Sequence, residues 1–251
     1  MIRYAFLAVA ATFIASCNSA PSQTPENAVG GANLVSSATA PFKTGTTSLT
    51  LDWGSKAKAG QFAIADVLSY GGPKPTINAP AGWLPICESS TKTTRQSLYG
   101  HAIQASDPST PTWTFSEPVD AQGAILLLDN VAGGWAVDVS SCTAGENGTL
   151  TAKPVATTID GDLILAFNAT DFGAYRATAC TGCGALNPTL PPDVSVVINQ
   201  ESTAREYWIL QNYQNQMGET EPLESSAPQI YNWVAAQVAI KRGAAATPSN
   251  G

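Results

Sequence analysis

The chain has 251 residues, a formal net charge of −7 at pH 7, and charged side chains at only 12% of its positions. This composition argues against a protein that holds nucleic acid by its phosphates, because there is no basic stripe to release counterions. The same acidity argues against electrostatic docking on anionic lipid, and solubility accounts for it. Without its first segment the chain keeps roughly 200 residues, which fits one domain.

Residues 1–16 are typical of a secretory signal peptide. Arg3 is a positive n-region, and Ala5–Ala15 is an apolar run that is too short to span a bilayer. The tetrapeptide 14–17 (IASC) resembles the lipobox of bacterial lipoproteins. That resemblance implies cleavage before Cys17 and a lipid on its sulfur, and several acyl chains anchor a protein stably. Cleavage by the general signal peptidase is the alternative.

Residues 17–40 contain the lipidated cysteine and then mostly Ser, Ala, Pro, Asn and Gly. Such a segment buries too little apolar surface to fold alone, so we expect a flexible linker. We expect the folded domain over residues 41–243 and a frayed tail over residues 244–251. Asn18 is not the Asp that retains lipoproteins in the inner membrane in enterobacteria-like sorting. The resemblance therefore implies the outer membrane, facing the periplasm or the cell surface.

The body of the chain alternates short apolar runs with turn residues, which is typical of strands and not of helices. Pro and Gly recur every several residues, and little of the sequence has a helical period. The predicted strands are 48–53, 61–68, 99–105, 112–116, 121–129, 162–169, 194–198, 205–213 and 233–240. We therefore expect an all-β fold, a two-sheet antiparallel β-sandwich.

A faint internal repeat runs through this pattern. Residues 60–65 parallel residues 161–166, and residues 94–99 parallel residues 204–208, with an apolar strand closing each half. We interpret the repeat as two similar β-layers, each unable to cover its own apolar face, that pack on each other. Tandem duplicated domains are the alternative, but each would have only about 100 residues.

Four cysteines remain once Cys17 is assigned to lipid. In an oxidising compartment they allow three connectivities. We favour Cys87–Cys142 as a long-range bridge and Cys180–Cys183 as a local staple, because the CTGC segment is loop-like. A thioredoxin-like role for CTGC would need its first cysteine at a helix N-terminus, and no helical pattern follows.

Several motifs recur in a recognisable order. They are GQFAIA (60–65), PAGW (80–83), Tyr99 with His101 and Ala102, Asp107-Pro108, TWTFS (112–116), the run 124–131, Val137-Asp138 and GDLILA (161–166). Their order resembles a widespread β-sandwich module of secreted bacterial proteins and of phage tail and fibre proteins, similar to a concanavalin-like jelly roll. The resemblance covers about residues 45–242. It implies the fold more than the function, although some such modules are taken to bind glycans or to serve in adhesion.

No catalytic signature is present in the sequence. His101 is the only histidine, it lies in a predicted strand, and no Gly-x-Ser-x-Gly elbow occurs, so we expect a structural histidine. Jelly-roll glycanases usually carry a Glu-x-Asp-x-x-Glu signature, which is absent. Glu219, Glu221 and Glu224 cluster in an apparent loop. We expect a protein that is not an enzyme and uses no cofactor, with a carbohydrate-active hydrolase or lyase as an alternative.

Oxygen-rich segments that suit Ca²⁺ are the remaining candidates for metal binding. Asp129-Asn130, Asp138, Asn168 and Asp171 could supply such ligands, but no EF-hand or Gly-rich repeat surrounds them. We expect them to serve in turns and expect no metal.

Trp135 is the main candidate for ligand binding. It follows Gly133-Gly134 in an apparent loop, whereas the other tryptophans lie in strands or close a turn. Exposed aromatic rings beside polar groups are typical of glycan sites, and Tyr175 and Tyr70 are weaker candidates. A cap over the end of the sandwich is the alternative role for Trp135. The sequence thus favours a membrane-tethered binding or adhesion module for glycans. A structural or protein-interaction envelope lipoprotein, of prophage origin, is the alternative.

Overall fold

The computed structural model describes residues 31–71, 75–146, 149–171, 193–201, 205–226 and 232–243. In these residues it is almost entirely antiparallel strand, with one short 3-10 helix, Gly54–Lys56. The strands are β1 (Asn33–Thr50), β2 (Phe62–Tyr70), β3 (Ile77–Asn78), β4 (Leu84–Ser90), β5 (Thr94–Ala102), β6 (Thr112–Asp129), β7 (Val137–Gly145), β8 (Thr149–Ala152), β9 (Ala156–Thr157), β10 (Asp162–Asp171), β11 (Ser195–Glu201), β12 (Arg205–Gln214), β13 (Gly218–Glu219), β14 (Leu223–Ser226) and β15 (Asn232–Ile240). Over the described part of the chain, no helix has the length and apolar character to cross a membrane.

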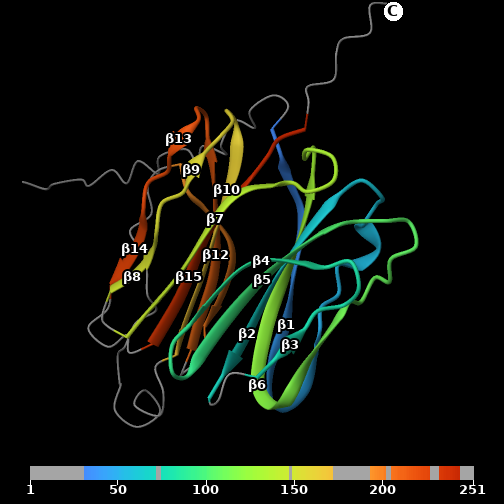
Figure 1. Cartoon of the computed structure of the whole chain (residues 1–251), viewed down its shortest axis with the longest axis vertical. Helices are drawn as coiled ribbons and strands as arrows, with labels where there is room; N and C mark the ends of the chain where they lie inside the picture. The colour runs from blue at the N-terminus through green and yellow to red at the C-terminus, as the bar shows by residue number, and fades with distance from the viewer. Residues whose placement is uncertain are drawn as a thin grey trace, which may run out of the picture.

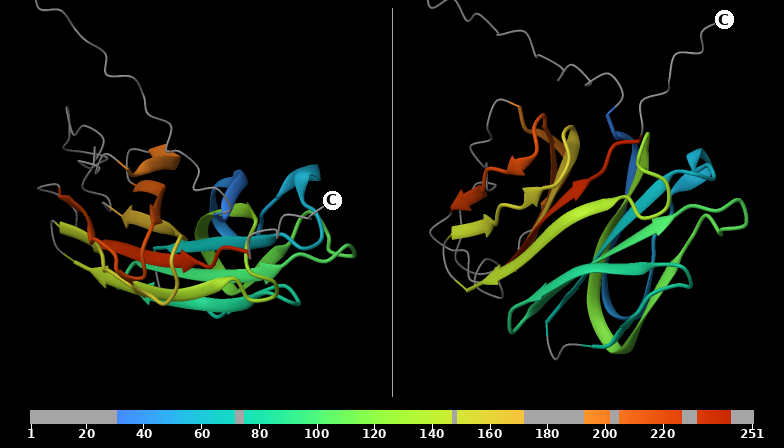
Figure 2. Two further views of the ribbon diagram at one scale, coloured as in Figure 1. Left: turned by 90° about the horizontal axis from the view of Figure 1, so that it is seen from above. Right: turned by 45° about the horizontal axis from the view of Figure 1, so that its top comes forward.

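Each half of the chain builds one of the two main sheets (Figures 1 and 2). The first sheet has the strand order β1-β6-β2-β5-β4, with β3 attached to β6. The second has the order β11-β12-β10-β15-β7. The two sheets pack as an all-β antiparallel sandwich, so the predicted fold class is confirmed. The two halves form two layers of one sandwich and not two separate domains.

The core lies between the sheets and is filled by alternate residues of the central strands. Phe62 and Ile64 of β2 meet Leu163 and Phe167 of β10 there, all without exposed surface. The outer faces are covered as well, which is why β2 and β10 are buried along their whole length. The bent outer parts of β1 and β6 cover the first sheet, and β8 and β14 cover the second.

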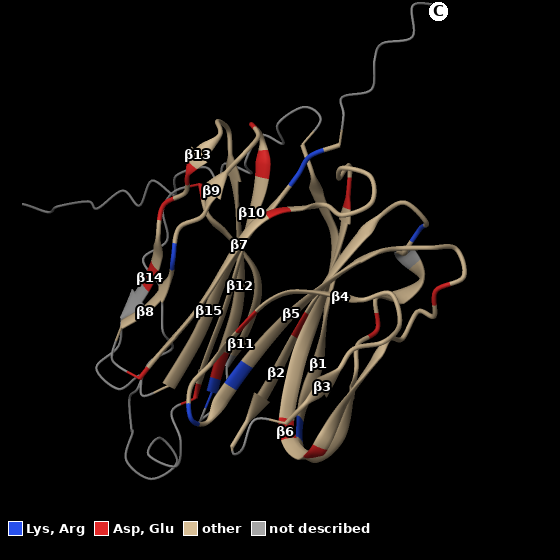
Figure 3. Ribbon diagram, in the orientation of Figure 1, with Lys and Arg blue, Asp and Glu red and all other residues tan. Residues whose placement is uncertain are grey.

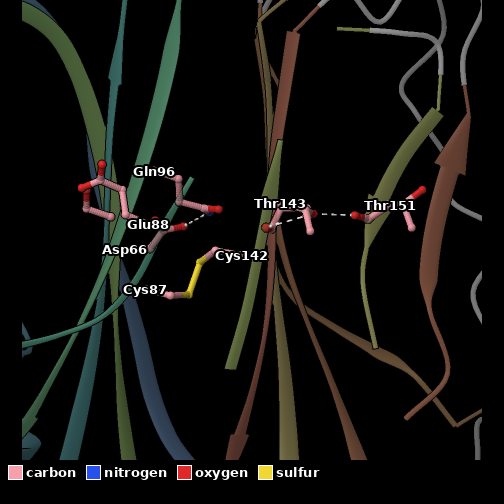
Figure 4. Close-up of a disulfide and its surroundings, with 9 residues drawn as sticks. Asp66, Cys87, Glu88, Gln96, Cys142, Thr143 and Thr151 are labelled. Carbon is pink, nitrogen blue, oxygen red and sulfur yellow. Dashed lines mark hydrogen bonds between the residues drawn. A yellow bond between two sulfur atoms is a disulfide. The ribbon is translucent and has the colours of Figure 1, made fainter. Parts of the chain in front are cut away.

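A disulfide joins the two sheets at one edge. Cys87 in β4 is bonded to Cys142 in β7, with their Cα atoms 6.0 Å apart (Figure 4). This confirms the predicted long-range bridge. Cys17, Cys180 and Cys183 lie outside the described residues.

The folded domain begins earlier than the expected residue 41. β1 starts at Asn33, and Ala32 before it is fully buried, with its carbonyl accepting a hydrogen bond from the Tyr213 hydroxyl at 3.2 Å. The sequence hides this strand because β1 is a sheet edge with several register shifts, so its side chains are partly exposed and lack a clear apolar period. The expected linker therefore ends before residue 32.

Candidate ligand-binding end of the sandwich

The loop from Asn130 to Ala136 connects the two sheets and is fixed along its length. Ala132 N donates to Lys241 O at 3.0 Å, and Lys241 N donates to Ala136 O at 2.8 Å. Gly243 N donates to Asn130 O at 2.6 Å, so the last described residues tie down the start of the loop. Side chains on this loop are therefore held at one end of the sandwich by backbone hydrogen bonds, although the loop itself is irregular.

Trp135 extends from this loop over the end of the core. Its ring meets the Phe62 ring edge-on, with centroids 5.7 Å apart, and 37% of the residue stays exposed. The ring can lie in this position because Gly100 has no side chain. A Cβ atom at Gly100 would lie 3.0 Å from the Trp135 ring and 2.7 Å from Phe62 Cζ, closer than side chains pack. The ring thus caps the sandwich and still offers surface to solvent.

Leu84 extends the apolar surface beside Trp135. It is opposite Gly100 on the edge strand β4, and residues that are directly opposite share a face of the sheet. Leu84 is 56% exposed. We call the exposed side chains of Trp135 and Leu84, which lie on either side of the buried Gly100, the Trp135 patch.

The two tyrosine candidates do not join this patch in the structure. Tyr70 is buried at the far end of β2, where its ring lies 4.5 Å from the Arg205 guanidinium carbon and packs against Phe42. A sugar cannot reach this ring, so Tyr70 is corrected to an interior residue. Tyr175 lies outside the described residues.

His101 is a buried strand histidine, as expected. Its Nδ1 lies 2.9 Å from Gly82 O, and its Nε2 lies 2.6 Å from Asp107 Oδ2. The ring stacks on Trp83 and Trp53, with centroids 5.1 and 6.1 Å apart. Both ring nitrogens therefore have a partner within the domain, which agrees with a structural role for His101.

The His101 contact also acts on its carboxylate partner. Burial alone would raise the pKa of Asp107, but hydrogen bonds from the Gln104 amide and from His101 prevail and lower it. Asp107 Oδ2 accepts both bonds at 2.6 Å.

A pair of carboxyl groups, Asp138 and Asp162, lies near the same end of the sandwich and was only half anticipated. The sequence singles out Asp138 but not Asp162, which begins β10 as an ordinary polar residue. Burial raises the pKa of Asp162 to about 7, and the negative charge of Asp138 contributes to the rise. Asp138 accepts two bonds from Thr158 at 2.6 Å, and these outweigh its burial and lower its pKa.

This carboxyl pair does not match the arrangement used in glycoside hydrolysis. There the two groups stand roughly 5–10 Å apart on either side of the sugar bond. Asp162 has no exposed surface, so its carboxyl group cannot flank a sugar bond together with Asp138. The pair has the raised pKa of a general acid without its geometry.

The other acidic candidates are dispersed. Asp129 and Asn130 form a turn in which Asp129 Oδ1 accepts from Asn130 N at 2.9 Å, and Asn130 has a positive φ of 53°. Asp171 lies at the far end of β10, 3.8 Å from Arg205. Within the described ranges, no three His, Cys, Asp or Glu side chains come together as metal ligands would.

Comparison with known proteins gives no relative. No family model, no curated protein and no solved structure matches the chain.

Proposed function

We propose that this chain is an extracytoplasmic lipoprotein, anchored through Cys17, whose sandwich binds glycans on the exposed face of the Trp135 ring. The observation that supports the proposal is the half-exposed Trp135 ring on a loop held by three backbone hydrogen bonds. A ring already fixed by Phe62 and Gly100 loses little freedom when a ligand stacks on it, which favours binding.

The character of the surface supports an uncharged, polar ligand. Charged residues are sparse, and both signs are scattered over the two sheets (Figure 3). Sugars bind through aromatic faces and neutral hydrogen-bonding groups, which suits a protein with few charged side chains. The resemblance to sandwich modules of secreted and phage fibre proteins agrees with this ligand class.

A glycan array tests the ligand. The protein should comprise residues 31–243, so that β1 stays whole. We expect wild type to bind and Trp135→Ala to lose at least about tenfold in affinity, which corresponds to about 1.4 kcal/mol. Leu84→Ala is the matched control, because it removes an exposed apolar side chain beside the ring. Binding that survives Trp135→Ala contradicts the site.

The same two variants separate a glycan from a protein partner. The exposed apolar side chains of both Trp135 and Leu84 favour protein docking as the second candidate. A protein interface would lose affinity in both variants, whereas a stacked sugar depends on the aromatic ring alone. Pull-down from solubilised envelopes with wild type, Trp135→Ala and Leu84→Ala tests this candidate.

The anchor has its own experiment. Cys17→Ser in the full-length chain should remove the lipid, shift the mature mass and release the protein from the membrane fraction. A Cys17→Ser protein that stays in that fraction contradicts the lipoprotein proposal and leaves the ligand test unaffected.

A further inference from the structure

The two sheets have the same topology when each half of the chain is numbered from its own start. The five main strands of the first half are β1, β2, β4, β5 and β6, and those of the second are β7, β10, β11, β12 and β15. In both sheets the spatial order is first, fifth, second, fourth, third. The outer parts of the first and fifth strands cover the first sheet, and β8 and β14, which follow the first strand and precede the fifth, cover the second.

The register of the two sheets agrees residue by residue at the third and fourth strands. β4 pairs with β5, and β11 pairs with β12, and each edge strand has one extra residue at the same point, Ile86 and Val197. Cys87 and Ile198 follow these bulges and are equivalent. The matching pairs are Leu84–Gly100 with Ser195–Gln211, Pro85–Tyr99 with Val196–Leu210, Cys87–Leu98 with Ile198–Ile209, and Ser89–Gln96 with Gln200–Tyr207.

The first and fifth strands repeat this agreement. β1 has a bulge at Val35 against β6, and β7 has one extra residue between Val137 and Ser140 against β15. The matching pairs are Leu34–Leu128 with Val137–Ile240, Ser37–Leu126 with Ser140–Val238, and Thr39–Ala124 with Cys142–Ala236. A bulge is a local irregularity that sheet formation does not require. Two bulges at equivalent places therefore point to common descent and not to a shared fold alone.

We propose that the domain is a tandem duplication of one half-sandwich module, and that the inner face of each half is an interface formed for a second copy of that module. The core then corresponds to a homodimer interface whose partner has become part of the same chain. The two edges of this interface are not packed equally, because β4 and β7 lie closer together than the equivalent strands β11 and β1.

Side chains on this interface have diverged, whereas the strand order and these registers agree. Cys142 is equivalent to Thr39, and Cys87 to Ile198, so only one of the two equivalent edges carries the disulfide. At the other edge Gln200 Nε2 donates to Thr39 Oγ1 at 2.7 Å. Gln96 and Tyr207 are equivalent as well, and both act on the buried carboxyl of Asp66 in the centre.

The proposal fixes where the ends of the domain lie. The end of β6 and the start of β7 are equivalent to the end of β15 and the start of β1. Figure 1 shows the start of β1 beside the end of β15. On this equivalence Gly243 corresponds to Val131, and Ala32 corresponds to Trp135. In the native chain the three residues Ala132-Gly133-Gly134 join Val131 to Trp135. A link of three residues should therefore be long enough to join Gly243 to Ala32.

A circular permutant tests this requirement. The new chain runs from Gly134 to Gly243, continues through Ala-Gly-Gly to Ala32, and ends at Gly133. A second permutant carries a flexible linker of about 12 residues, long enough to join the ends wherever they lie. The readouts are mass by light scattering, formation of Cys87–Cys142 by peptide mapping, and Tm.

We expect the three-residue permutant to be a monomer with the native disulfide and a Tm within about 10 °C of wild type. If it is dimeric or unfolded while the long-linker permutant is a native monomer, the ends are not equivalent and the proposal is overturned. If neither permutant folds, this result also contradicts the proposal. Equivalent halves require that the chain can be opened at residues 132–134 once Gly243 is joined to Ala32. None of these outcomes depends on the glycan proposal.

Discussion

The Trp135 ring stands at 87° to the Phe62 ring, so the edge of one aromatic meets the face of the other. This T-shaped contact is favourable beyond the area that it buries, typically by about 0.5–1.5 kcal/mol. It orients Trp135 before any ligand arrives. The contact depends on the missing side chain of Gly100.

Gly100→Ala should therefore displace the Trp135 ring. The added Cβ would come within 3.0 Å of Trp135 and 2.7 Å of Phe62. We expect a shift in tryptophan fluorescence, a loss of ligand affinity close to that of Trp135→Ala, and a stability loss of about 1–3 kcal/mol from overpacking. Gly133→Ala in the same loop is the control, since nothing lies within 4 Å of its added Cβ. Equal effects of the two variants would contradict the claim that the missing side chain of Gly100 holds the Trp135 ring in place.

The buried carboxyl of Asp66 should make the protein less stable as the pH rises. Burial raises its pKa from 3.8 to about 7, although the hydrogen bond from Gln96 and the nearby Tyr207 hydroxyl oppose the rise. Its Oδ2 accepts from Gln96 Nε2 at 2.9 Å, while its Oδ1 has no bond of good geometry. Because the folded state holds the proton more tightly, this contribution is full below about pH 4 and is lost as the pH passes 7.

Asp66→Asn should remove most of that loss. The rise in pKa corresponds to at most about 4 kcal/mol, so the variant should exceed wild type in free energy of unfolding at pH 8 and approach it at pH 4. Urea denaturation at both values measures the difference. Glu224→Gln, an exposed carboxyl on β14, is the control and should leave the pH slope unchanged. If the free energy of unfolding of Asp66→Asn falls with pH as steeply as that of wild type, the Asp66 carboxyl is not the cause of the pH dependence.

The His101–Asp107 contact should stabilise the folded domain, and this stabilisation should require both side chains. Asp107→Asn removes the charge that faces Nε2 at 2.6 Å, and we expect a loss of about 1–3 kcal/mol. His101→Gln and the double variant complete a mutant cycle, and the coupling energy should be a large part of either single loss. Additive losses would mean that the two side chains act independently. Because the pKa of Asp107 is lowered, its contribution is present at neutral pH and is lost as acid protonates it.

The disulfide should stabilise the sandwich by restricting the unfolded chain. Cys87 and Cys142 are separated by 55 residues in sequence, for which a loss of about 2–4 kcal/mol is typical. Cys87→Ala with Cys142→Ala should lower the denaturation midpoint and leave the strands intact by circular dichroism. Reduced wild type should behave like this double variant. An unchanged midpoint would contradict a clamping role.

Alternating and continuous apolar runs predict the buried strands well. The runs at 61–68 and 162–169 become β2 and β10, the central strands of the two sheets, because burial on both faces leaves a strong apolar signal. Edge strands give a weaker signal, so most of β1 and all of β4 are missed. The second pairing of the repeat is one residue out of register, since Gln96 and not Ser97 is equivalent to Tyr207.

The candidate site is predictable only in part. A tryptophan after two glycines indicates a loop, and Trp135 is indeed half exposed. Its support could not be read from the sequence, because Gly100 and Phe62 are distant in the chain and meet only through strand pairing. The pairing of Asp138 with Asp162 is invisible for the same reason. Tyr70, beside a glycine as Trp135 is, was misplaced because its strand continues into the core.

The position of Ala32 determines how the domain responds to mechanical load. Ala32 lies at the same end of the sandwich as the Trp135 loop, where Asn33 pairs with Asp129 (Figure 1). A force applied between the residues before Ala32 and a ligand bound at Trp135 acts first on the Asn33–Asp129 pair. The hydrogen bonds between β1 and β6 then break one after another from that end. The opposite edge stays clasped by Cys87–Cys142, so tension opens the outermost strand long before it separates the sheets.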